Sequence, residues 1–325
     1  MKRTLSFLLA IVLILSLAAC APKAVDKTAV RVTALKGPTG MGMVGLMDSA
    51  EKGETANDYE FLDFASAPDE LTGLIVGGNV DIAAVPSNLA SVLYNRTEGG
   101  IKLIALNTLG VLYILEKGDS INSIDDLRGK TVYASGQGAT PEYALNYILE
   151  QNGIDPENDV TIEYRAEHSE LASLILAGEA DIVLLPEPFV TNVTMKDESI
   201  RRAIDITAEW DAAAGGQSLL TMGCLVVSSE FAENNPAAVK TFLEEYAKSV
   251  AFVNSDTAAA AELIVKYEIA ANVELAQKAI PGCNIVCITG DEMVEKSSGF
   301  LKVLFDYNPK AVGGALPGDD FYYGS

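Results

Sequence analysis

The alternation of apolar and polar residues predicts one structural unit that occurs twice, 100 residues apart. Residues 64–89 align with residues 164–189 without a gap, and eight of the 26 aligned positions are identical. In each copy a predicted strand (59–65 and 160–164) precedes a helix with apolar residues at positions i, i+3 and i+4. A glycine then ends the helix, and the apolar run that follows is typical of a parallel strand buried on both faces.

The segments before each copy extend the repeat toward the N-terminus. Residues 30–35 and 130–135 have the pattern of strands, and each leads into a glycine-rich turn followed by a helix. Each half therefore begins strand, loop, helix, strand, helix, strand, which is the half-unit of an open doubly wound sheet. In such sheets ligands bind at the carboxyl ends of the strands.

Two long strand-like runs, residues 106–116 and 219–229, flank the second copy and predict two crossovers between lobes. The rest of the chain has a helical pattern to its end. The sequence thus predicts an α/β fold of two lobes, each an open doubly wound sheet, joined by two crossover strands in a hinge geometry. The first lobe would contain residues 30–110 and, after a return, the helical residues 225–325, and the second lobe would contain residues 111–224.

The N-terminus has the pattern of an export signal: a basic pair, an apolar run and small residues before Cys20. We expect residues 1–19 to be removed as a signal peptide and residues 20–29 to form a tether. Leu-Ala-Ala-Cys resembles the lipobox of bacterial lipoproteins, which implies that Cys20 carries the lipid and that the protein lies on the outer face of the cytoplasmic membrane, at the cell surface or in the periplasm. The alternative is a plain signal peptide with a coincidental cysteine.

The amino-acid composition argues against several classes of function. Lys and Arg number 23 against 45 Asp and Glu, for a net charge of −22, so we expect no nucleic-acid partner. A single histidine, His168, argues against histidine catalysis and a multi-histidine metal site, and we expect it at the surface. Cys224 is expected to be buried, whereas a disulfide between Cys283 and Cys287 is left open.

The two glycine-rich turns are the candidate anion cradle, because backbone N–H groups at a helix start attract negative charge. The alternative is ordinary turn chemistry. The candidate ligand-binding residues of the two turns are Gly37, Pro38, Thr39, Gly40, Met41, Ser135, Gln137, Gly138, Ala139 and Thr140.

Further candidates lie at the end of the third strand of each half and on the crossovers. They are Ser87, Asn88, Asn107, Thr108, Glu187, Pro188, Ser218 and Thr221. Glu187 is the repeat partner of Ser87, and a carboxylate in an anion cradle repels the ligand unless the ligand carries a cation or donor. This favours a zwitterion or an amine-bearing heterocycle, with a helix cap as the alternative role of Glu187. Trp210 fits a core position and a ring-stacking position equally well.

The whole pattern resembles the extracytoplasmic solute-binding proteins of ABC importers, in particular the nitrate, sulfonate and taurine group, whose relatives also bind thiamine-pyrimidine precursors. The features that carry the resemblance are the Gly-x-x-Asp-Ile sequences within 77–82 and 177–182, Pro186-Glu187-Pro188, and residues 123–130. The resemblance implies a type II periplasmic-binding-protein fold in a monomeric substrate-binding lipoprotein that captures a small anionic or zwitterionic organic solute. It also implies delivery to an ABC permease, without enzymatic activity or a cofactor. The alternatives are a sensory or adhesive lipoprotein and a pyrimidine-precursor synthase-like enzyme.

Overall fold

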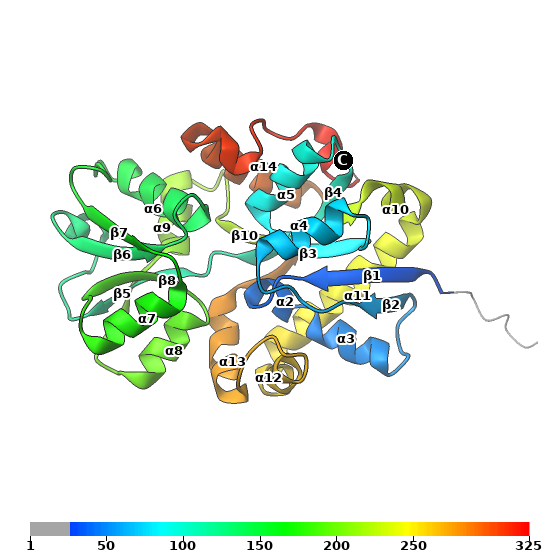
Figure 1. Cartoon of the computed structure of the whole chain (residues 1–325), viewed down its shortest axis with the longest axis horizontal. Coiled ribbons are helices and arrows are strands. Elements are labelled where there is room, and N and C mark those ends of the chain that lie inside the picture. Colours follow the sequence, from blue (N-terminus) through cyan, green and yellow to red (C-terminus); the bar gives the residue numbers. More distant parts are fainter. Residues whose placement is uncertain (1–26, 325) are drawn as a thin grey trace, which may run out of the picture.

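Two β-sheets joined by two passages of the chain form the framework of the computed structural model, which describes residues 27–324 (Figure 1). The first sheet has six strands, in the spatial order β11 (Ile285–Ile288), β4 (Ile101–Leu109), β10 (Thr221–Ser228), β3 (Ile82–Pro86), β1 (Ala29–Ala34) and β2 (Asp58–Phe61). The second has five, in the order β7 (Thr161–Arg165), β6 (Thr131–Ser135), β8 (Ile182–Pro186), β5 (Leu112–Lys117) and β9 (Ile200–Asp205). We call the six-stranded sheet with its helices lobe I and the five-stranded sheet with its helices lobe II.

The two sheets repeat the same topology, which confirms the predicted internal repeat. In lobe I, β1 pairs in parallel with β2 and β3, and in lobe II, β6 pairs in parallel with β7 and β8. The strand beside β3 is β10, which is antiparallel, and the strand beside β8 is β5, also antiparallel. The chain passes directly from β4 of lobe I to β5 of lobe II, and it returns from the last helix of lobe II to β10 of lobe I. Each sheet therefore contains one strand that begins immediately after a crossing between the lobes.

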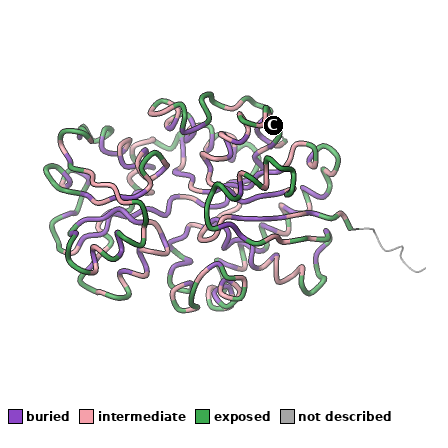
Figure 2. Tube along the Cα trace, viewed as in Figure 1, coloured by how far each residue is buried: buried purple, intermediate pink, exposed green. Residues whose placement is uncertain are grey.

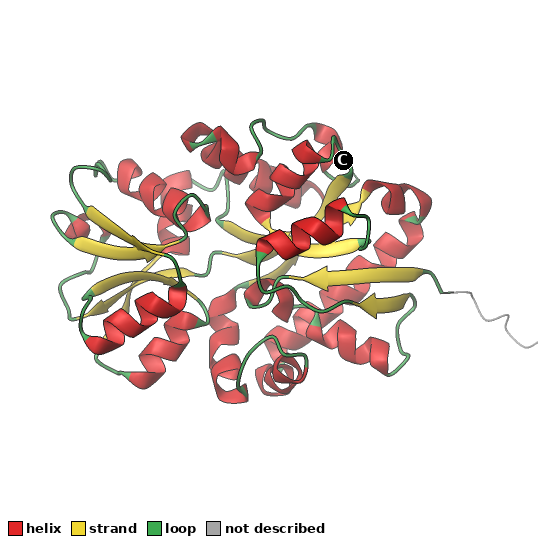
Figure 3. Ribbon diagram, viewed as in Figure 1, coloured by secondary structure: helices red, strands yellow, loops and turns green. Residues whose placement is uncertain are grey.

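Helices cover both faces of each sheet (Figure 3). Those of lobe I are α2 (Pro38–Met41), α3 (Val44–Glu51), α4 (Pro68–Val76), α5 (Ser87–Arg96), α10 (Ser229–Asn234), α11 (Pro236–Ser255), α12 (Thr257–Lys266), α13 (Val273–Ala279) and α14 (Gly290–Tyr307). Those of lobe II are α6 (Thr140–Gln151), α7 (His168–Ala177), α8 (Phe189–Lys196) and α9 (Ile206–Ala214). Single 3₁₀ turns are η1 (Ile124–Leu127), η2 (Ile280–Cys283), η3 (Pro309–Val312) and η4 (Asp319–Phe321).

The wholly apolar strand β3 contributes to two cores at once. Ala83 and Val85 pack in the cluster that includes residues of α5 and α14, whereas Ile82 and Ala84 pack in the cluster that includes residues of α3 and α11. A strand covered on both faces has no solvent side, which explains the lack of polar alternation in its sequence. Figure 2 shows the resulting buried trace through the middle of both sheets.

One of these clusters crosses from lobe I to lobe II through α14. The ring of Phe300 in α14 lies 5.8 Å from that of Trp210 in α9, and Asn308 Nδ2 donates to the Tyr143 hydroxyl of α6 at 3.0 Å. Trp210 is fully buried, and its ring also packs against that of Tyr147, with the centroids 4.7 Å apart and the planes tilted by 45°. The structure therefore supports a core position for Trp210 rather than a position that stacks on a ligand ring.

The structure corrects the expected pattern of the C-terminal third. The segment after residue 229 is not wholly helical, because β11 forms an edge strand beside β4. The expected boundary between residues 224 and 225 falls inside β10, which pairs with β3 and β4 along its length, so the chain re-enters the first sheet at Thr221.

Three cysteines lie in the described part of the chain, and all three are free. Cys224 is buried as expected, and Cys283 and Cys287 form no disulfide. The expected signal peptide, Cys20 and most of the tether lie outside the described residues, and Ala29, placed at the end of the tether, begins β1. Between residues 27 and 324, no helix has the length and hydropathy that crossing a membrane requires.

Candidate functional site

The carboxyl ends of the parallel strands of both lobes meet at the first passage of the chain between the lobes. Strand β4 ends at Leu109, and β5 begins at Leu112, which pairs with Pro186 at the end of β8. The backbone N–H of Glu187 donates to the carbonyl of Val111 in this passage at 2.9 Å. In lobe I, Pro86 at the end of β3 pairs with Gly223 of β10, and Gly223 also lies opposite Thr108 of β4. This edge of both sheets is therefore the candidate site.

Polar side chains of lobe I converge on Gly223. Asn107 Nδ2 donates to the carbonyl of Thr39 at 2.9 Å, and Thr108 Oγ1 donates to Asn107 Oδ1 at 3.1 Å. A Cβ atom at Gly223 would lie 2.6 Å from Asn107 Oδ1, 3.0 Å from Thr39 Oγ1 and 3.1 Å from Thr108 Oγ1. A side chain at position 223 would clash with these three side chains, so glycine lets them pack against the backbone of β10.

Two buried hydroxyl groups of lobe I lack a strong partner at the same edge. Thr221 is 0% exposed, and its Oγ1 has no hydrogen-bond partner among the described residues. Ser87 is 6% exposed, and its Oγ lies beside the Cys224 sulfur, a weak acceptor, without a hydrogen-bond partner among the described residues. Since a buried polar group without a partner costs about 1–3 kcal/mol, both hydroxyls favour a bound molecule that hydrogen-bonds to them.

The first glycine-rich turn positions Thr39, but the short helix after it attracts an anion less strongly than the sequence analysis expected. Gly37 has a φ of 91°, which a side chain disfavours, and Pro38 starts α2 after it. A Cβ atom at Gly40 would lie 2.7 Å from the Leu35 carbonyl oxygen. Helix α2 has only four residues, so its dipole is small.

Three of the predicted site residues have structural roles. Met41 is fully buried and packs in the hydrophobic core of lobe I. Asn88 Nδ2 donates to the carbonyl of Ala311 at 3.3 Å, and Ser218 Oγ accepts a hydrogen bond from Trp210 Nε1 at 2.9 Å. These contacts explain how the three side chains are held, and their role in lining the site stays a prediction.

A histidine that the sequence analysis placed at the surface contacts the second glycine-rich turn. His168, the first residue of α7, is half-buried, and its Nδ1 forms a hydrogen bond of 2.5 Å with Oγ of Ser135 at the end of β6. Its ring lies 5.4 Å from that of Phe189. Burial lowers the pKa of His168 below its usual range, and Glu167 opposes this shift, so the imidazole is neutral at pH 7.

The rest of this turn is accessible, but one of its donors is occupied. Gln137 and Gly138 are exposed, Ala139 is the N-cap of α6, and Thr140 is buried. The backbone N–H of Gly138 donates to Glu142 Oε2 at 2.5 Å. An anion at the start of α6 would therefore compete with the Glu142 carboxylate for this N–H.

Glu187 has an arginine partner within lobe II, which changes its expected role. Its Oε1 accepts hydrogen bonds from Arg202 Nη2 at 2.5 Å and from Thr191 Oγ1 at 3.0 Å, and its Oε2 accepts one from the Thr191 N–H at 3.1 Å. Burial raises the pKa of Glu187, whereas the Thr191 N–H and the Arg202 guanidinium oppose that shift. Arg202 thus provides the positive charge that the sequence analysis expected from the ligand. Pro188, the next residue, is the N-cap of α8.

The guanidinium of Arg202 also lies over the ring of Tyr113 in β5, 5.1 Å from its centroid. Its side chain is 41% exposed, and its Nε and Nη1 groups have no partner among the described residues. Arg202 therefore combines a fixed position with free donors.

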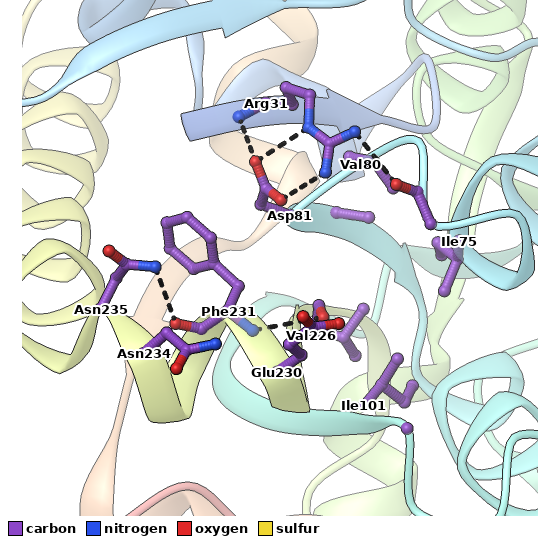
Figure 4. Close-up of a pocket in the computed structure, with 14 residues that line it drawn as sticks. Arg31, Ile75, Val80, Asp81, Ile101, Val226, Glu230, Phe231, Asn234 and Asn235 are labelled. Carbon is purple, nitrogen blue, oxygen red and sulfur yellow. Dashed lines mark hydrogen bonds and ion pairs between the residues drawn. The ribbon is translucent and has the colours of Figure 1, made fainter. Parts of the chain in front are cut away.

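The repeated Gly-x-x-Asp sequence has a different role, at the other end of lobe I. A pocket of about 270 Å³ lies there, and Arg31 and Asp81 are among the residues that line it (Figure 4). Asp81 accepts hydrogen bonds from the Arg31 N–H at 2.8 Å and from its guanidinium at 2.6 and 3.1 Å. This pair joins β1 to the start of β3, whereas the candidate site lies at the opposite end of both strands.

Sequence reasoning missed His168, Arg202 and Thr191. The repeat partner of His168 is Pro68, so the repeat gave no signal for it. Arg202 lies 15 residues after Glu187 on another strand, where spacing alone does not indicate a contact. Within residues 27–324, no group of three or more His, Cys, Asp or Glu side chains could hold a metal ion.

Comparison with known proteins identifies the family. Residues 62–251, more than half of the chain, match the family described as ABC transporter, phosphonate, periplasmic substrate-binding protein. No curated protein sequence matches the chain.

Solved structures of related transport proteins share the fold. An ABC transporter protein from Parabacteroides distasonis is 25% identical, with a TM-score of 0.74 over 91% of this chain and 99% of that chain. The periplasmic aliphatic sulphonate binding protein SsuA from Escherichia coli is 17% identical, with a TM-score of 0.70 over 89% of this chain and 96% of that chain. The periplasmic nitrate-binding protein NrtA from Synechocystis PCC 6803 is 12% identical, with a TM-score of 0.56 over 84% of this chain and 76% of that chain.

These matches confirm the expected type of fold and the expected role outside the cytoplasm in solute import rather than in catalysis. The chain belongs to the family of periplasmic substrate-binding proteins of phosphonate ABC transporters.

Proposed function

We propose that the protein captures a small organic anion between its two lobes and delivers it to an ABC permease. The observation that carries the proposal is the pair of buried hydroxyls, Ser87 Oγ and Thr221 Oγ1, that lack a strong partner where the strand ends meet. A solute oxygen that accepts hydrogen bonds from both would remove the cost of leaving them unpaired.

The charges around these hydroxyls support an anion over a cation. Among the described residues, Glu187 is the one buried carboxylate at this edge, and its partner Arg202 has further N–H groups without an acceptor there. The argument for a zwitterion loses its basis, because Glu187 does not require a cation from the ligand. The phosphonate family and the sulphonate-binding neighbour also support an acidic headgroup.

A thermal-shift screen with methylphosphonate, ethanesulfonate, nitrate and choline tests this proposal. We expect at least one of the organic anions to raise the melting temperature and choline to have no effect. At a concentration of 100 times Kd, a ligand that binds only the folded chain adds about 2.7 kcal/mol to the free energy of unfolding. Stabilisation by choline alone would contradict the proposal.

The Thr221→Val variant tests the hydroxyl contact itself. Because valine has nearly the shape of threonine and removes a buried group without a partner, we expect an unchanged or higher melting temperature. Affinity for the anion found in the screen should fall at least about tenfold, or 1.4 kcal/mol, by calorimetry.

Thr191→Val is the matched control, since the Thr191 hydroxyl is already bonded to Glu187 and Arg202. This variant should lose about 1–3 kcal/mol of folding stability. Wild-type affinity in Thr221→Val would show that its hydroxyl does not contact the solute.

We also propose that a lipid on Cys20 holds the protein at the outer face of the cytoplasmic membrane. The lipobox-like sequence before Cys20 supports this attachment. The Cys20→Ala variant, expressed in a bacterium, should move from the detergent phase to the aqueous phase on partitioning. A variant that stays in the detergent phase would disprove the anchor at Cys20.

A further inference from the structure

A turn of lobe I lies directly on the buried carboxylate of lobe II. Gly282 belongs to η2, between α13 and β11, and it is buried. A Cβ atom added to it would lie 2.7 Å from Glu187 Oε1, 3.1 Å from its Cγ and 3.2 Å from its Cδ. Figure 1 shows α13 of lobe I beside α8 of lobe II at this contact.

The Glu187 side chain cannot easily move away from such an atom. It is fully buried, and its two oxygens are held by Arg202 and by the hydroxyl and N–H of Thr191. Moving the carboxylate would break charge-assisted hydrogen bonds in a site that excludes water, which is costly. Separation of the two lobes is the alternative way to relieve the clash.

The backbone does not require glycine at position 282. Its φ is not positive, so an alanine could adopt the same backbone conformation without strain. The charges of Glu187 and Arg202 also affect Cys283, the next residue of the turn. Burial raises the pKa of Cys283, Glu187 raises it further, and Arg202 opposes the shift. The contact with lobe II is thus the feature that excludes a side chain at Gly282.

We infer that Gly282 is a positioning residue for lobe closure, because the absence of a side chain lets η2 of lobe I close over the Glu187–Arg202 pair of lobe II. The inference goes beyond the proposed function, since it does not depend on which solute binds. It assigns the buried Glu187 carboxylate, held in place by Arg202 and Thr191, the role of the surface of lobe II against which η2 packs, and this contact has no counterpart in the sequence repeat.

Distance measurements by pulsed electron paramagnetic resonance test this inference. Spin labels on Glu274→Cys in α13 and Lys196→Cys in α8 would report the separation of the two helices on either side of the contact. Both positions are exposed, and Cys287→Ser removes the half-buried native thiol from the background. The full chain is measured alone and with methylphosphonate or ethanesulfonate.

We expect a short-distance population in the wild type that is lost in Gly282→Ala. Gly73→Ala is the matched control, because Gly73 lies in α4 with nothing within 4 Å of its Cβ position, and it should keep the wild-type distribution. Adding Glu187→Ser to Gly282→Ala gives position 187 the residue of its repeat partner Ser87 and removes the opposing carboxylate, so the short distance should return.

The inference is overturned if Gly282→Ala keeps the wild-type distances, if the double variant does not recover them, or if the wild type has no short-distance population in any sample. Failure of the proposed function is recognised separately, because it would appear as an absence of anion binding while the distances still respond to Gly282→Ala.

Discussion

Buried hydroxyl groups need hydrogen-bond partners, and the proposed binding of a solute rests on this constraint at one edge of the two sheets. Thr221 and Ser87 lie where β10 and β3 meet, and residues 27–324 provide neither hydroxyl with a hydrogen-bond partner. The exchange of strands between lobes creates this place, because β5 and β10 enter their sheets directly after the chain has crossed from one lobe to the other. The fold thus brings the strand ends of both lobes to the same passage of the chain.

Binding of the proposed anion would require this acidic protein to overcome its own electrostatic repulsion. The net charge of −22 argues against attraction at long range, so recognition has to rest on short contacts. The described residues at the strand ends provide neutral donors, a neutral imidazole at His168, and a carboxylate at Glu187 whose charge Arg202 balances. Selectivity would then come from the geometry of hydrogen bonds rather than from the charge of the whole chain.

The architecture could be predicted from the sequence because its signals are local and occur twice. Apolar strands buried on both faces and helices ended by glycine recur at a fixed offset, and the structure contains both copies. Strand β11 was missed because it has only four residues, all apolar, which is too short a segment to show the alternation of a strand. The pairing of Glu187 with Arg202, and the structural contacts of Asn88 and Ser218, depend on tertiary packing that residue spacing does not encode.

The central claim is that the solute binds between the lobes, at the strand ends. A crystal structure of the protein with the anion that stabilises it most tests this claim directly. The account predicts that the anion lies within hydrogen-bond distance of Thr221 Oγ1 and Ser87 Oγ, with groups of lobe II on its other side. An anion found instead in the pocket beside Arg31 and Asp81, at the opposite end of lobe I, would contradict it.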